Sequence, residues 1–470
     1  MIDTLKKYNQ NALAAYLEKA DEADRKAIEK QLAQIHWDEL SGLIRDYVFQ
    51  KPETAIPDDL TPAPFIAFPP KTDAEKVRCA EAMKKGEELL SSGKVAALIV
   101  AGGQGTRLGW DGPKGTYPIT PVNSKTLFQY FAESLARVSE KYGSPVHWYV
   151  MTSELNNKPT QDFFKANDFF GLPESQITFF AQGMMPAIAY NGELILGGKD
   201  TLALAPNGHG GTLLALRRSG ALDKMKADGV EYISYFQVDN PLVPVADPLF
   251  IGMHALEGAE ISARMLPKTN PYEKLGNFCI TGGKLQIIEY SDMPAELAER
   301  TKPDGTLDFL AGSPAIHVIS REFIERLTQD GTLHMPWHRA DKKVAYIDGN
   351  GELVKPEANN AVKLESFIFD ALPLAKKTMV LEGCREELFA PTKNATGVDS
   401  AESCRAMLVA RDARRMEAAG VKIPRKADGT PDCIVELSPR DIFDDADAVE
   451  FFKQNPVPEV ERGAVIAFGR

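Results

Sequence analysis

The middle of the chain alternates short apolar runs of strand length with longer amphipathic segments of helical period. The clearest run is Val95–Ala101, in which every residue is apolar, as expected of a strand buried on both faces. Further strands are predicted at Val146–Met151, Ile177–Phe180 and Val230–Val238. Helices are predicted at Lys125–Lys141 and around Asp162. This alternation predicts the α/β class, with a doubly wound, mostly parallel sheet covered by helices on both faces.

The two ends of the chain follow other patterns. Residues 1–50 are predicted to be helical, because apolar residues recur at helical spacing, at Trp37, Leu40, Leu43, Ile44, Tyr47 and Val48. Residues 51–72 contain six prolines and are predicted to be an extended connector. From residue 395 onward a charged helix (Ala401–Ala419), a short strand (Cys433–Leu437) and an acidic tail are expected. We therefore predict a helical N-terminal segment with its connector (1–72), a large central domain (73–394) and a small C-terminal domain (395–470).

Composition limits the classes of partner. The 470-residue chain has 54 Lys and Arg against 66 Asp and Glu, a formal net charge of -12, which argues against nucleic acid or an anionic membrane as its main partner. Its five cysteines are scattered without a C-x-x-C pair and are expected to be free thiols in a reducing compartment. The N-terminus lacks the apolar segment of a signal peptide, and no run could span a bilayer. A cytoplasmic location is therefore predicted.

A glycine-rich loop follows Val95–Ala101 directly. Glycines stand at positions 102, 103, 105, 109, 112 and 115, where a side chain would keep a ligand from the backbone. Clustered backbone N–H groups bind anions, and Arg107 and Lys114 add two cations. The phosphate loop of ATPases is absent, and Leu108 replaces the third glycine of the dinucleotide fingerprint. The loop predicts a nucleoside triphosphate site; the alternative is a glycine-rich surface turn with incidental charges.

The string from Leu98 to Lys114 resembles the signature L-x-x-x-G-G-x-G-T-R-L-G-x-x-x-P-K of the UDP-sugar pyrophosphorylases, the eukaryotic-type uridylyltransferases. Later segments resemble motifs of the UDP-N-acetylhexosamine pyrophosphorylases, in the same order: Phe180–Pro186, Pro206–Gly211, Val238–Val243 with Ala246–Pro248, Glu289–Asp292, Lys363–Asp370 and Phe389–Asn394. The likeness extends from about residue 95 to residue 394. It implies that residues 73–394 form a Rossmann-like, GT-A-like nucleotidyltransferase domain.

The resemblance also implies roles for individual residues. The implied nucleotide-binding residues are Ala101, Gly102, Gly103, Gly105, Thr106, Gln182 and Gly208. The implied sugar-binding residues are His209, Gly276, Glu289, Ser313, Phe367 and Phe369. The implied catalytic cations are Arg107, Lys114 and Lys393, and Asp239 is the implied ligand of a Mg²⁺ cofactor. The implied partners are UTP and a sugar-1-phosphate.

Without the resemblance, several of these residues have plainer interpretations. A glutamine before a glycine, such as Gln182, is ordinarily a loop residue, although its amide can donate and accept as recognition of a uracil edge requires. Asp239 after a strand suits Mg²⁺, a hard cation that prefers oxygen ligands, but a helix cap or turn is equally consistent. Phe367 and Phe369 alternate as in a short strand, which by itself predicts two core residues.

The implied reaction joins two anions. An oxygen of the sugar-1-phosphate attacks the α-phosphorus of UTP, pyrophosphate leaves, and a UDP-sugar is formed. The nucleophile is already charged, so no general base is expected. Catalysis should consist of positioning and electrostatic stabilisation. Arg107 and Lys114 would neutralise the triphosphate, and Lys393 would hold the sugar phosphate.

The departures from the family pattern concern the sugar. His209 stands where the hexosamine enzymes have Asn, and Gly-His-Gly is nearer to the UDP-glucose pyrophosphorylases. Ser313 and Ile316 replace two asparagines, and Asn207 replaces an aspartate. We predict N-acetylglucosamine-1-phosphate as the substrate, with glucose-1-phosphate as the alternative. A non-catalytic nucleotide-sugar sensor is a hypothesis of another class, which the presence of Arg107 and Lys114 disfavours. Sequence leaves the oligomeric state open.

Overall fold

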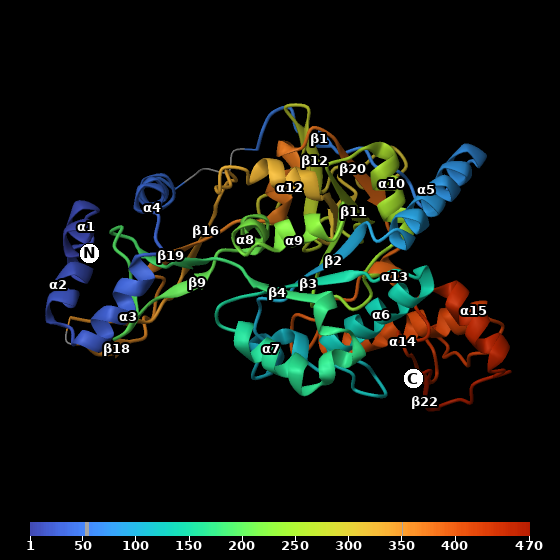
Figure 1. Cartoon of the computed structure of the whole chain (residues 1–470). Coiled ribbons are helices and arrows are strands. Elements are labelled where there is room, and N and C mark those ends of the chain that lie inside the picture. The colour runs from blue at the N-terminus through green and yellow to red at the C-terminus, as the bar shows by residue number, and fades with distance from the viewer. Residues whose placement is uncertain (52–55, 350) are drawn as a thin grey trace. The chain divides into compact units, whose positions relative to one another are not determined.

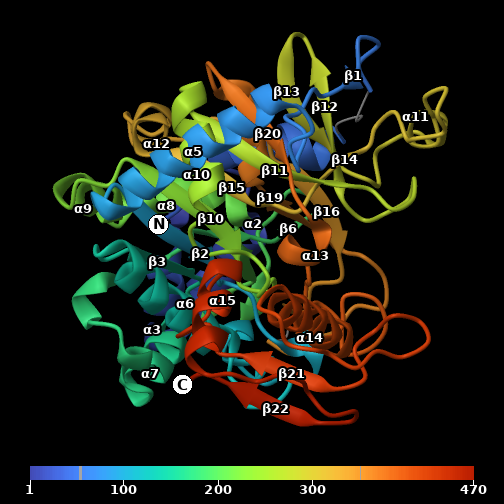
Figure 2. The same cartoon turned by 90° about the vertical axis from the view of Figure 1, so that its right-hand side faces the viewer.

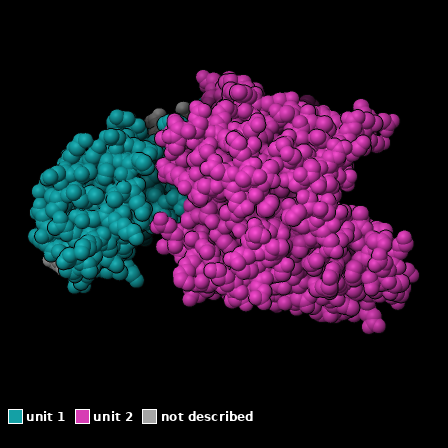
Figure 3. Space-filling view, in the orientation of Figure 1, with its two compact units in different colours: residues 1–56, 182–211, 334–371 teal, residues 57–181, 212–333, 372–470 magenta. Residues whose placement is uncertain are grey.

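The computed structural model describes residues 1–51, 56–349 and 351–470 (Figure 1). The chain forms two compact units that are interleaved in sequence. Unit 1 comprises residues 1–56, 182–211 and 334–371, and unit 2 comprises residues 57–181, 212–333 and 372–470 (Figure 3). The predicted domain boundaries at residues 72 and 394 stay a prediction, because the two units group residues by proximity in space. Residues 52–55 of the predicted connector lie outside the described residues.

Unit 2 contains a large sheet with the strand order β1-β12-β14-β11-β15-β10-β2-β3-β4, to which β13 and β20 are added beside β12 and β11. Its strands are β1 (Thr61–Pro62), β2 (Val95–Val100), β3 (His147–Thr152), β4 (Ile177–Ala181), β10 (Tyr232–Gln237), β11 (Ile261–Pro267), β12 (Gly276–Thr281), β13 (Lys284–Ile288), β14 (Ala311–Ser313), β15 (His317–Ser320) and β20 (Thr378–Glu382). The strands β10, β2, β3 and β4 are parallel neighbours, whereas β15 pairs antiparallel with β10 and β11. The predicted α/β class with its mostly parallel sheet is therefore confirmed.

Helices surround this sheet. They are α5 (Asp73–Ser91), α6 (Leu127–Tyr142), α7 (Asn157–Ala166), α8 (Thr212–Arg218), α9 (Ala221–Ala227), α10 (Pro248–Glu257), α11 (Ala295–Ala298), α12 (Arg321–Leu327), α13 (Arg385–Leu388), α14 (Ala401–Ala418) and α15 (Asp445–Gln454). The predicted elements β2, β3, β4, β10, α6 and α7 are all present, with ends that differ from the prediction by a few residues. Thr126 caps the N-terminus of α6 and Gly143, in the left-handed conformation, ends it. These local signals explain why the helix begins and ends there.

The core of unit 2 lies on both faces of β2. Val95, Ala97 and Ile99 belong to one hydrophobic cluster, and the alternate residues Ala96 and Leu98 are buried as well. A strand buried on both faces needs the continuous apolar run that the sequence has. The C-terminal end of this strand, where the glycine loop begins, is thereby held in a fixed position.

The crossing of α5 and α10 is unusually close, and Figure 2 shows the two helices side by side. A Cβ atom added at Gly252 would lie 1.7 Å from the carbonyl oxygen of Ala82, and one added at Gly86 would lie 1.8 Å from that of Pro248. Both neighbours are backbone atoms, which cannot rotate out of the way. Two glycines are therefore required where these helices cross.

The C-terminal residues differ from the prediction of an acidic tail. The predicted helix and strand correspond to α14 and β21 (Ile434–Leu437), but the tail also contains α15 and a strand β22 (Val465–Phe468) that pairs parallel with β21. The acidic residues are used as caps and partners: Asp444 accepts from the backbone N–H of Asp447, and Asp447 lies 2.7 Å from Arg137 of α6. The acidic stretch therefore has a helix and a strand that its charge did not indicate.

Unit 1 combines N-terminal helices with small sheets. The helices are α1 (Ile2–Lys7), α2 (Asn11–Lys19), α3 (Glu22–Leu32), α4 (Trp37–Leu43) and the π-helix η1 (Ile44–Phe49). The strands are β5 (Met184–Pro186), β6 (Ile188–Ala189), β7 (Leu196–Gly198), β8 (Thr201–Leu202), β9 (Leu204–Pro206), β16 (His338–Lys342), β17 (Tyr346–Ile347), β18 (Leu353–Val354) and β19 (Ala361–Glu365). Buried Gln10 joins the helices to the strands, donating to Gly192 and accepting from Leu194.

Among the described residues, no helix combines the length and the apolar composition needed to cross a bilayer.

The close helix crossing gives a stability prediction. We expect Gly252→Ala to lower the free energy of unfolding by about 2 kcal/mol, the usual scale for an overpacked site, because the new methyl group meets the carbonyl of Ala82. Urea denaturation measures this change. Gly42→Ala in α4 is the matched control, since no atom lies within 4 Å of its added Cβ, and it should be neutral or stabilising. An equally stable Gly252→Ala protein would contradict this account of the crossing.

Candidate active site

The glycine loop of unit 2 folds back on itself. The backbone N–H of Gly105 donates to Gly112, and that of Lys114 donates to Gly103, at 2.9 and 3.1 Å. Among the described residues, no acceptor is found for the backbone N–H groups of Gly102 and Gly103. Open amides at the carboxyl end of a central strand are suited to phosphate oxygens.

Two buried side chains that sequence reasoning missed hold this loop. Asn156 donates to the carbonyl oxygens of Ala101 at 2.9 Å and Gly103 at 3.3 Å, and Ser153 donates to that of Gly102 at 2.9 Å. Both residues are fully buried. With the carbonyl oxygens occupied by Ser153 and Asn156, the loop presents its N–H groups rather than its oxygens. No motif marks these two residues, which lie just after β3 and about fifty positions after the glycine loop in the chain.

Thr106 and Arg107 follow the loop in a short 3₁₀ helix, Thr106–Leu108. Both side chains are exposed. Among the described residues, the guanidinium of Arg107 has no ion pair and no hydrogen bond. An exposed arginine beside open amides can bind a phosphate in a two-pronged manner.

Lys114 and Asp239 form the charged centre of the candidate site in unit 2. The Nζ of Lys114 lies 3.6 Å from an Oδ of Asp239, and each side chain is 11% exposed. Gly115 allows Lys114 to lie this deep, because a Cβ there would stand 2.2 Å from the ring of Phe128. At 3.6 Å the two charges attract without a hydrogen bond, so both retain donor or acceptor capacity for a ligand.

The chain segment after α13 is joined to Asp239. The backbone N–H of Thr392 donates to the carbonyl oxygen of Asp239 at 2.7 Å. Asn240 donates to Leu388 at 2.7 Å and accepts from Ala390 at 2.9 Å. Lys393 directly follows Thr392 and is therefore fixed relative to Asp239. The structure thus brings together the loop, Lys114, Asp239 and Lys393, which are far apart in the sequence.

Asp239 can be tested as a metal ligand. Among the described residues, no group of three or more His, Cys, Asp or Glu side chains could hold a metal ion. A single carboxylate is nevertheless a suitable protein ligand for Mg²⁺, which keeps waters and takes its other ligands from substrate phosphates. Asp239 is mostly buried and lies beside open amides, and its carboxylate makes no hydrogen bond among the described residues. The residues fit a cation that arrives with a phosphate ligand.

Three of the predicted sugar-binding residues lie together in unit 2. Gly276 of β12 pairs with Ser313 of β14, and an Oε of Glu289 would stand 3.4 Å from a Cβ added at Gly276. The same Cβ would lie 2.5 Å from Ile287, so glycine is required there. Lys268, which sequence reasoning missed, donates to Asn277 in the next position at 2.5 Å. Burial lowers the pKa of this lysine.

The remaining predicted residues belong to unit 1. Gln182 is buried, and its amide has no hydrogen-bond partner among the described residues. An amide that no other side chain or backbone group engages is available for ligand recognition. Gly183 accepts from the backbone N–H of Asn207 at 3.0 Å, which joins the Gln182 segment to the glycine segment that follows.

The glycines after Asn207 allow another segment to approach. Gly208 has a φ of +86°, and a Cβ there would lie 2.3 Å from the carbonyl oxygen of Ser366. A Cβ at Gly210 would lie 2.7 Å from the backbone nitrogen of Phe367. Gly208 and Gly210 are therefore in direct contact with the segment that carries the two predicted phenylalanines.

His209, Phe367 and Phe369 form an aromatic group. The ring of His209 stacks on Phe367 at 5.3 Å, and Phe367 and Phe369 lie 5.1 Å apart. The strand pattern suggested for the two phenylalanines is wrong: β19 ends at Glu365, and Ile368–Leu374 form a 3₁₀ helix. Phe369 is 8% exposed, whereas Phe367 is only half-buried. Phe367 is thus the better placed of the two to touch a ligand.

The charge state of His209 is set by its surroundings. Burial, with a smaller contribution from His338, lowers the pKa of His209 to about 4. Its Nδ1 lies 3.3 Å from the backbone N–H of Ile368 and accepts from it, so the ring proton is on Nε2. At neutral pH this side chain is therefore an uncharged ring whose Nε2 is a donor.

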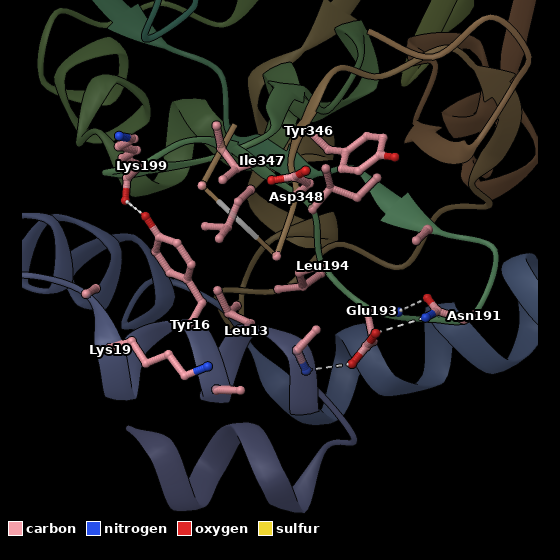
Figure 4. Close-up of a pocket in the computed structure, with 18 of the residues that line it drawn as sticks. Leu13, Tyr16, Lys19, Asn191, Glu193, Leu194, Lys199, Tyr346, Ile347 and Asp348 are labelled. Carbon is pink, nitrogen blue, oxygen red and sulfur yellow. Dashed lines mark hydrogen bonds between the residues drawn. The ribbon is translucent and has the colours of Figure 1, made fainter. Parts of the chain in front are cut away.

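A separate cavity of about 810 Å³ lies within unit 1 (Figure 4). Tyr16 and Leu13 of α2 line one side, and Tyr346 and Ile347 line another. Tyr16 donates to the carbonyl oxygen of Lys199 at 2.9 Å. None of the predicted site residues lines this cavity. Cavity volume alone therefore does not identify the candidate active site.

Comparison with known proteins adds independent information. Residues 64–462 match the family model described as UTP–glucose-1-phosphate uridylyltransferase. The chain is 38% identical, over 79% of its length and 78% of the relative, to UDP-N-acetylhexosamine pyrophosphorylase-like protein 1 of Mus musculus. It is 33% identical to UDP-N-acetylglucosamine diphosphorylase 2 of Arabidopsis thaliana, covering 93% of this chain and 88% of that one.

A solved structure has the same fold. The uridine diphosphate N-acetylglucosamine pyrophosphorylase of Trypanosoma brucei superposes with a TM-score of 0.81 at 25% identity, covering 99% of this chain and 97% of that one. The similarity therefore includes both units and not only the central sheet.

The depressed pKa of His209 predicts a pH dependence of stability. A histidine that is neutral when folded destabilises the native state once the pH falls below its unfolded pKa of about 6.5. Between pH 6.5 and pH 4.5 this group should remove about 2 kcal/mol from the free energy of unfolding, with no effect above pH 7. Urea denaturation at each pH measures the loss.

His209→Asn isolates this contribution from that of other titrating groups. The variant should lose less stability than the unmodified protein over the same pH interval. His36→Asn is the control, because His36 is exposed in the same unit. Parallel curves for the unmodified protein and the His209→Asn variant would contradict the assignment of a buried neutral ring.

Proposed function

The chain belongs to the UTP–glucose-1-phosphate uridylyltransferase family, and we propose that it makes UDP-N-acetylglucosamine and pyrophosphate from UTP and N-acetylglucosamine-1-phosphate. The choice of sugar is supported by the names of relatives that cover most of the chain and by the Phe367–Asp370 motif. The Lys114–Asp239 pair beside the open amides of the glycine loop carries the assignment of a phosphoryl site.

The proposed reaction is an in-line displacement at phosphorus. A bond forms between an oxygen of the sugar phosphate and the α-phosphorus of UTP, and the bond from that phosphorus to the bridging oxygen of the leaving group breaks. The electron pair of the broken bond departs with pyrophosphate. Because the nucleophile is a phosphate oxygen, no proton has to be removed, and no general base is assigned.

The main obstacle is repulsion between two anions, and the protein opposes it with fixed positive charge and N–H groups. The open amides of Gly102 and Gly103, which follow buried Ala101, are proposed to hold the nucleotide together with Thr106, and Gly105 would keep the loop in shape through its hydrogen bond to Gly112. Arg107 and Lys114 would neutralise the triphosphate and the departing pyrophosphate, and Lys393 would bind the sugar phosphate. Groups that are fixed before the reaction stabilise the transition state without further reorganisation.

Asp239 is the proposed ligand for Mg²⁺. When bound, the cation would shield phosphate charge as it does in other phosphoryl-transfer enzymes. The protein's own contribution is to keep the carboxylate of Asp239 buried, tied through its carbonyl oxygen to Thr392 and 3.6 Å from Lys114.

Recognition of the uncharged parts of the substrates is assigned to other residues. Gln182 would pair with the uracil edge, and Gly208 would allow close approach of the backbone. His209 with Phe367 and Phe369, and Gly276 with Glu289 and Ser313, would contact the sugar. Rings and neutral polar groups suit a ligand part that has hydroxyl groups and no charge.

Glucose-1-phosphate is a second candidate substrate. His209 favours it, because a ring in this position fills space that an asparagine would leave to a 2-substituent. Ser313 acts in the opposite direction, since it is smaller than the asparagine of the family motif. The two effects oppose each other, and the named relatives favour the N-acetylated sugar.

We also propose that the protein acts in the cytoplasm, a reducing compartment that suits its five free cysteines.

An assay of pyrophosphate release tests the proposed function. The protein would be incubated with UTP, Mg²⁺ and a panel of sugar-1-phosphates, with ATP and GTP as alternative nucleotides. We expect pyrophosphate with UTP, fastest with N-acetylglucosamine-1-phosphate, and little with the purine nucleotides. Pyrophosphate release with glucose-1-phosphate alone would make that sugar phosphate the assigned substrate. No pyrophosphate release with any sugar-1-phosphate would contradict the proposed function.

Lys114→Ala tests the electrostatic role. We expect kcat to fall by ~10²–10³, or roughly 3–4 kcal/mol, as is typical for removal of one preorganised group at a charged transition state. Lys125→Ala is the matched control, because Lys125 is a buried lysine of the same unit that pairs with Glu133 at 2.6 Å. The control should lower stability and leave kcat within about twofold. Unchanged turnover in Lys114→Ala would remove Lys114 from the mechanism.

A further inference from the structure

A single carboxylate in unit 1 holds the segment that carries Phe367. One Oδ of Asp370 accepts from the Nε2 of His338 at 2.8 Å and from the backbone N–H of Phe367 at 3.2 Å. A carboxylate can only accept, so the Nε2 of His338 must carry a proton. The side chain of Asp370 is 11% exposed, and a hydrogen bond to a charged group that is largely buried is among the stronger ones.

His338 also contacts the ring of Phe367. Their ring centroids are 4.3 Å apart with an interplanar angle of 31°. The same phenylalanine stacks with His209 at 5.3 Å and 23°. Phe367 is thus oriented by two imidazole rings and fixed at its backbone by Asp370. Two rings and a backbone contact restrict its orientation more than simple burial would.

The fold explains why these residues meet. His338 is the first residue of β16 and pairs with Glu365, the last residue of β19. The chain leaves β19 through Ser366 and reaches Phe367 beside His338. Asp370 lies three residues further on, and its backbone N–H donates to the carbonyl oxygen of Phe367 at 3.1 Å. This tight turn returns the carboxylate to the start of the segment.

The other side of the segment is equally constrained. The backbone of Ser366 and Phe367 lies against Gly208 and Gly210 so closely that no Cβ fits there. A segment in contact with glycine backbone on one side has to be positioned from the other side if its ring is to stay in place. His338 and Asp370 supply that second set of contacts.

We propose that His338 and Asp370 are positioning residues that set the orientation of Phe367, and through it the part of the binding free energy that comes from the sugar. This inference rests on the proposed function, in which Phe367 contacts the sugar. Neither residue is required to touch the substrate. Their loss should weaken binding of the sugar and leave binding of the nucleotide unchanged.

Calorimetric titration of the full chain with UDP, UDP-N-acetylglucosamine and UDP-glucose tests the proposal. The ratio of the Kd for UDP to the Kd for the preferred UDP-sugar measures what the sugar contributes. In Asp370→Ala we expect this ratio to fall about tenfold with the Kd for UDP unchanged. Asp370→Asn retains an acceptor oxygen and should restore most of the ratio. The same split should appear in KM, which rises for the sugar-1-phosphate and not for UTP.

A double-mutant cycle and a matched control complete the design. If His338 acts through Asp370, His338→Phe should lower the ratio in the unmodified protein and have little further effect in Asp370→Ala. His338→Phe keeps a ring and also serves if Asp370→Ala is recovered unfolded. Asp341→Ala is the control. Asp341 lies in β16, as His338 does, but its carboxylate pairs with Arg339.

Three outcomes would overturn the proposal. The ratio could stay unchanged in both variants, or UDP and the UDP-sugar could lose affinity by the same factor, or Asp341→Ala could produce the same change. Failure of the proposed function is distinguishable, because the unmodified protein would then bind neither UDP nor a UDP-sugar.

Discussion

The pairing of Lys114 with Asp239 is the constraint on which the candidate phosphate site of unit 2 depends. Both charges are mostly buried, and burying an ion pair gives little or no stability because desolvation offsets the attraction. The surrounding structure therefore has to provide the positions. Continuous packing around β2 fixes the loop, Gly115 fits against the ring of Phe128 where a Cβ would not, and Thr392 holds the carbonyl oxygen of Asp239. Since this buried ion pair adds little to the stability of the fold, the simplest explanation for it is a chemical role of its two charges.

The aromatic group of unit 1, formed by His209, Phe367 and Phe369, follows a different physical rule. His209 is neutral because burial lowers its pKa, and its ring stacks on that of Phe367. A charged imidazole would have to be desolvated there, and the nearby carboxylate of Asp370 is compensated by hydrogen bonds from His338 and from the backbone of Phe367. Under the proposed function, the fixed charges would neutralise phosphate, and the rings would contact hydroxyl groups and carbon surfaces of the sugar.

Sequence was sufficient for features that depend on local chemistry. The apolar run of β2, the capped helix α6 and the glycine loop each have a pattern that a single physical requirement produces. Sequence was not sufficient where the requirement lies in distant contacts. Ser153 and Asn156 hold the loop but lack a motif, and His338 meets Asp370 only because β16 pairs with β19. The interleaving of the two units has no local signature at all, and Asp447 could not be assigned a partner without α6.

The prediction for Phe367 and Phe369 shows why the missing information matters for function. Alternation in the sequence treated the two residues as equivalent, whereas the 3₁₀ turn after β19 separates them into a half-buried ring and a buried one. The turn exists because Asp370 returns to the backbone of Phe367. Asp370 thus determines which of the two aromatic rings is the more exposed. If Phe367 contacts the sugar as proposed, removing this carboxylate would move the ring, so substrate preference would depend on the turn as well as on Phe367 itself.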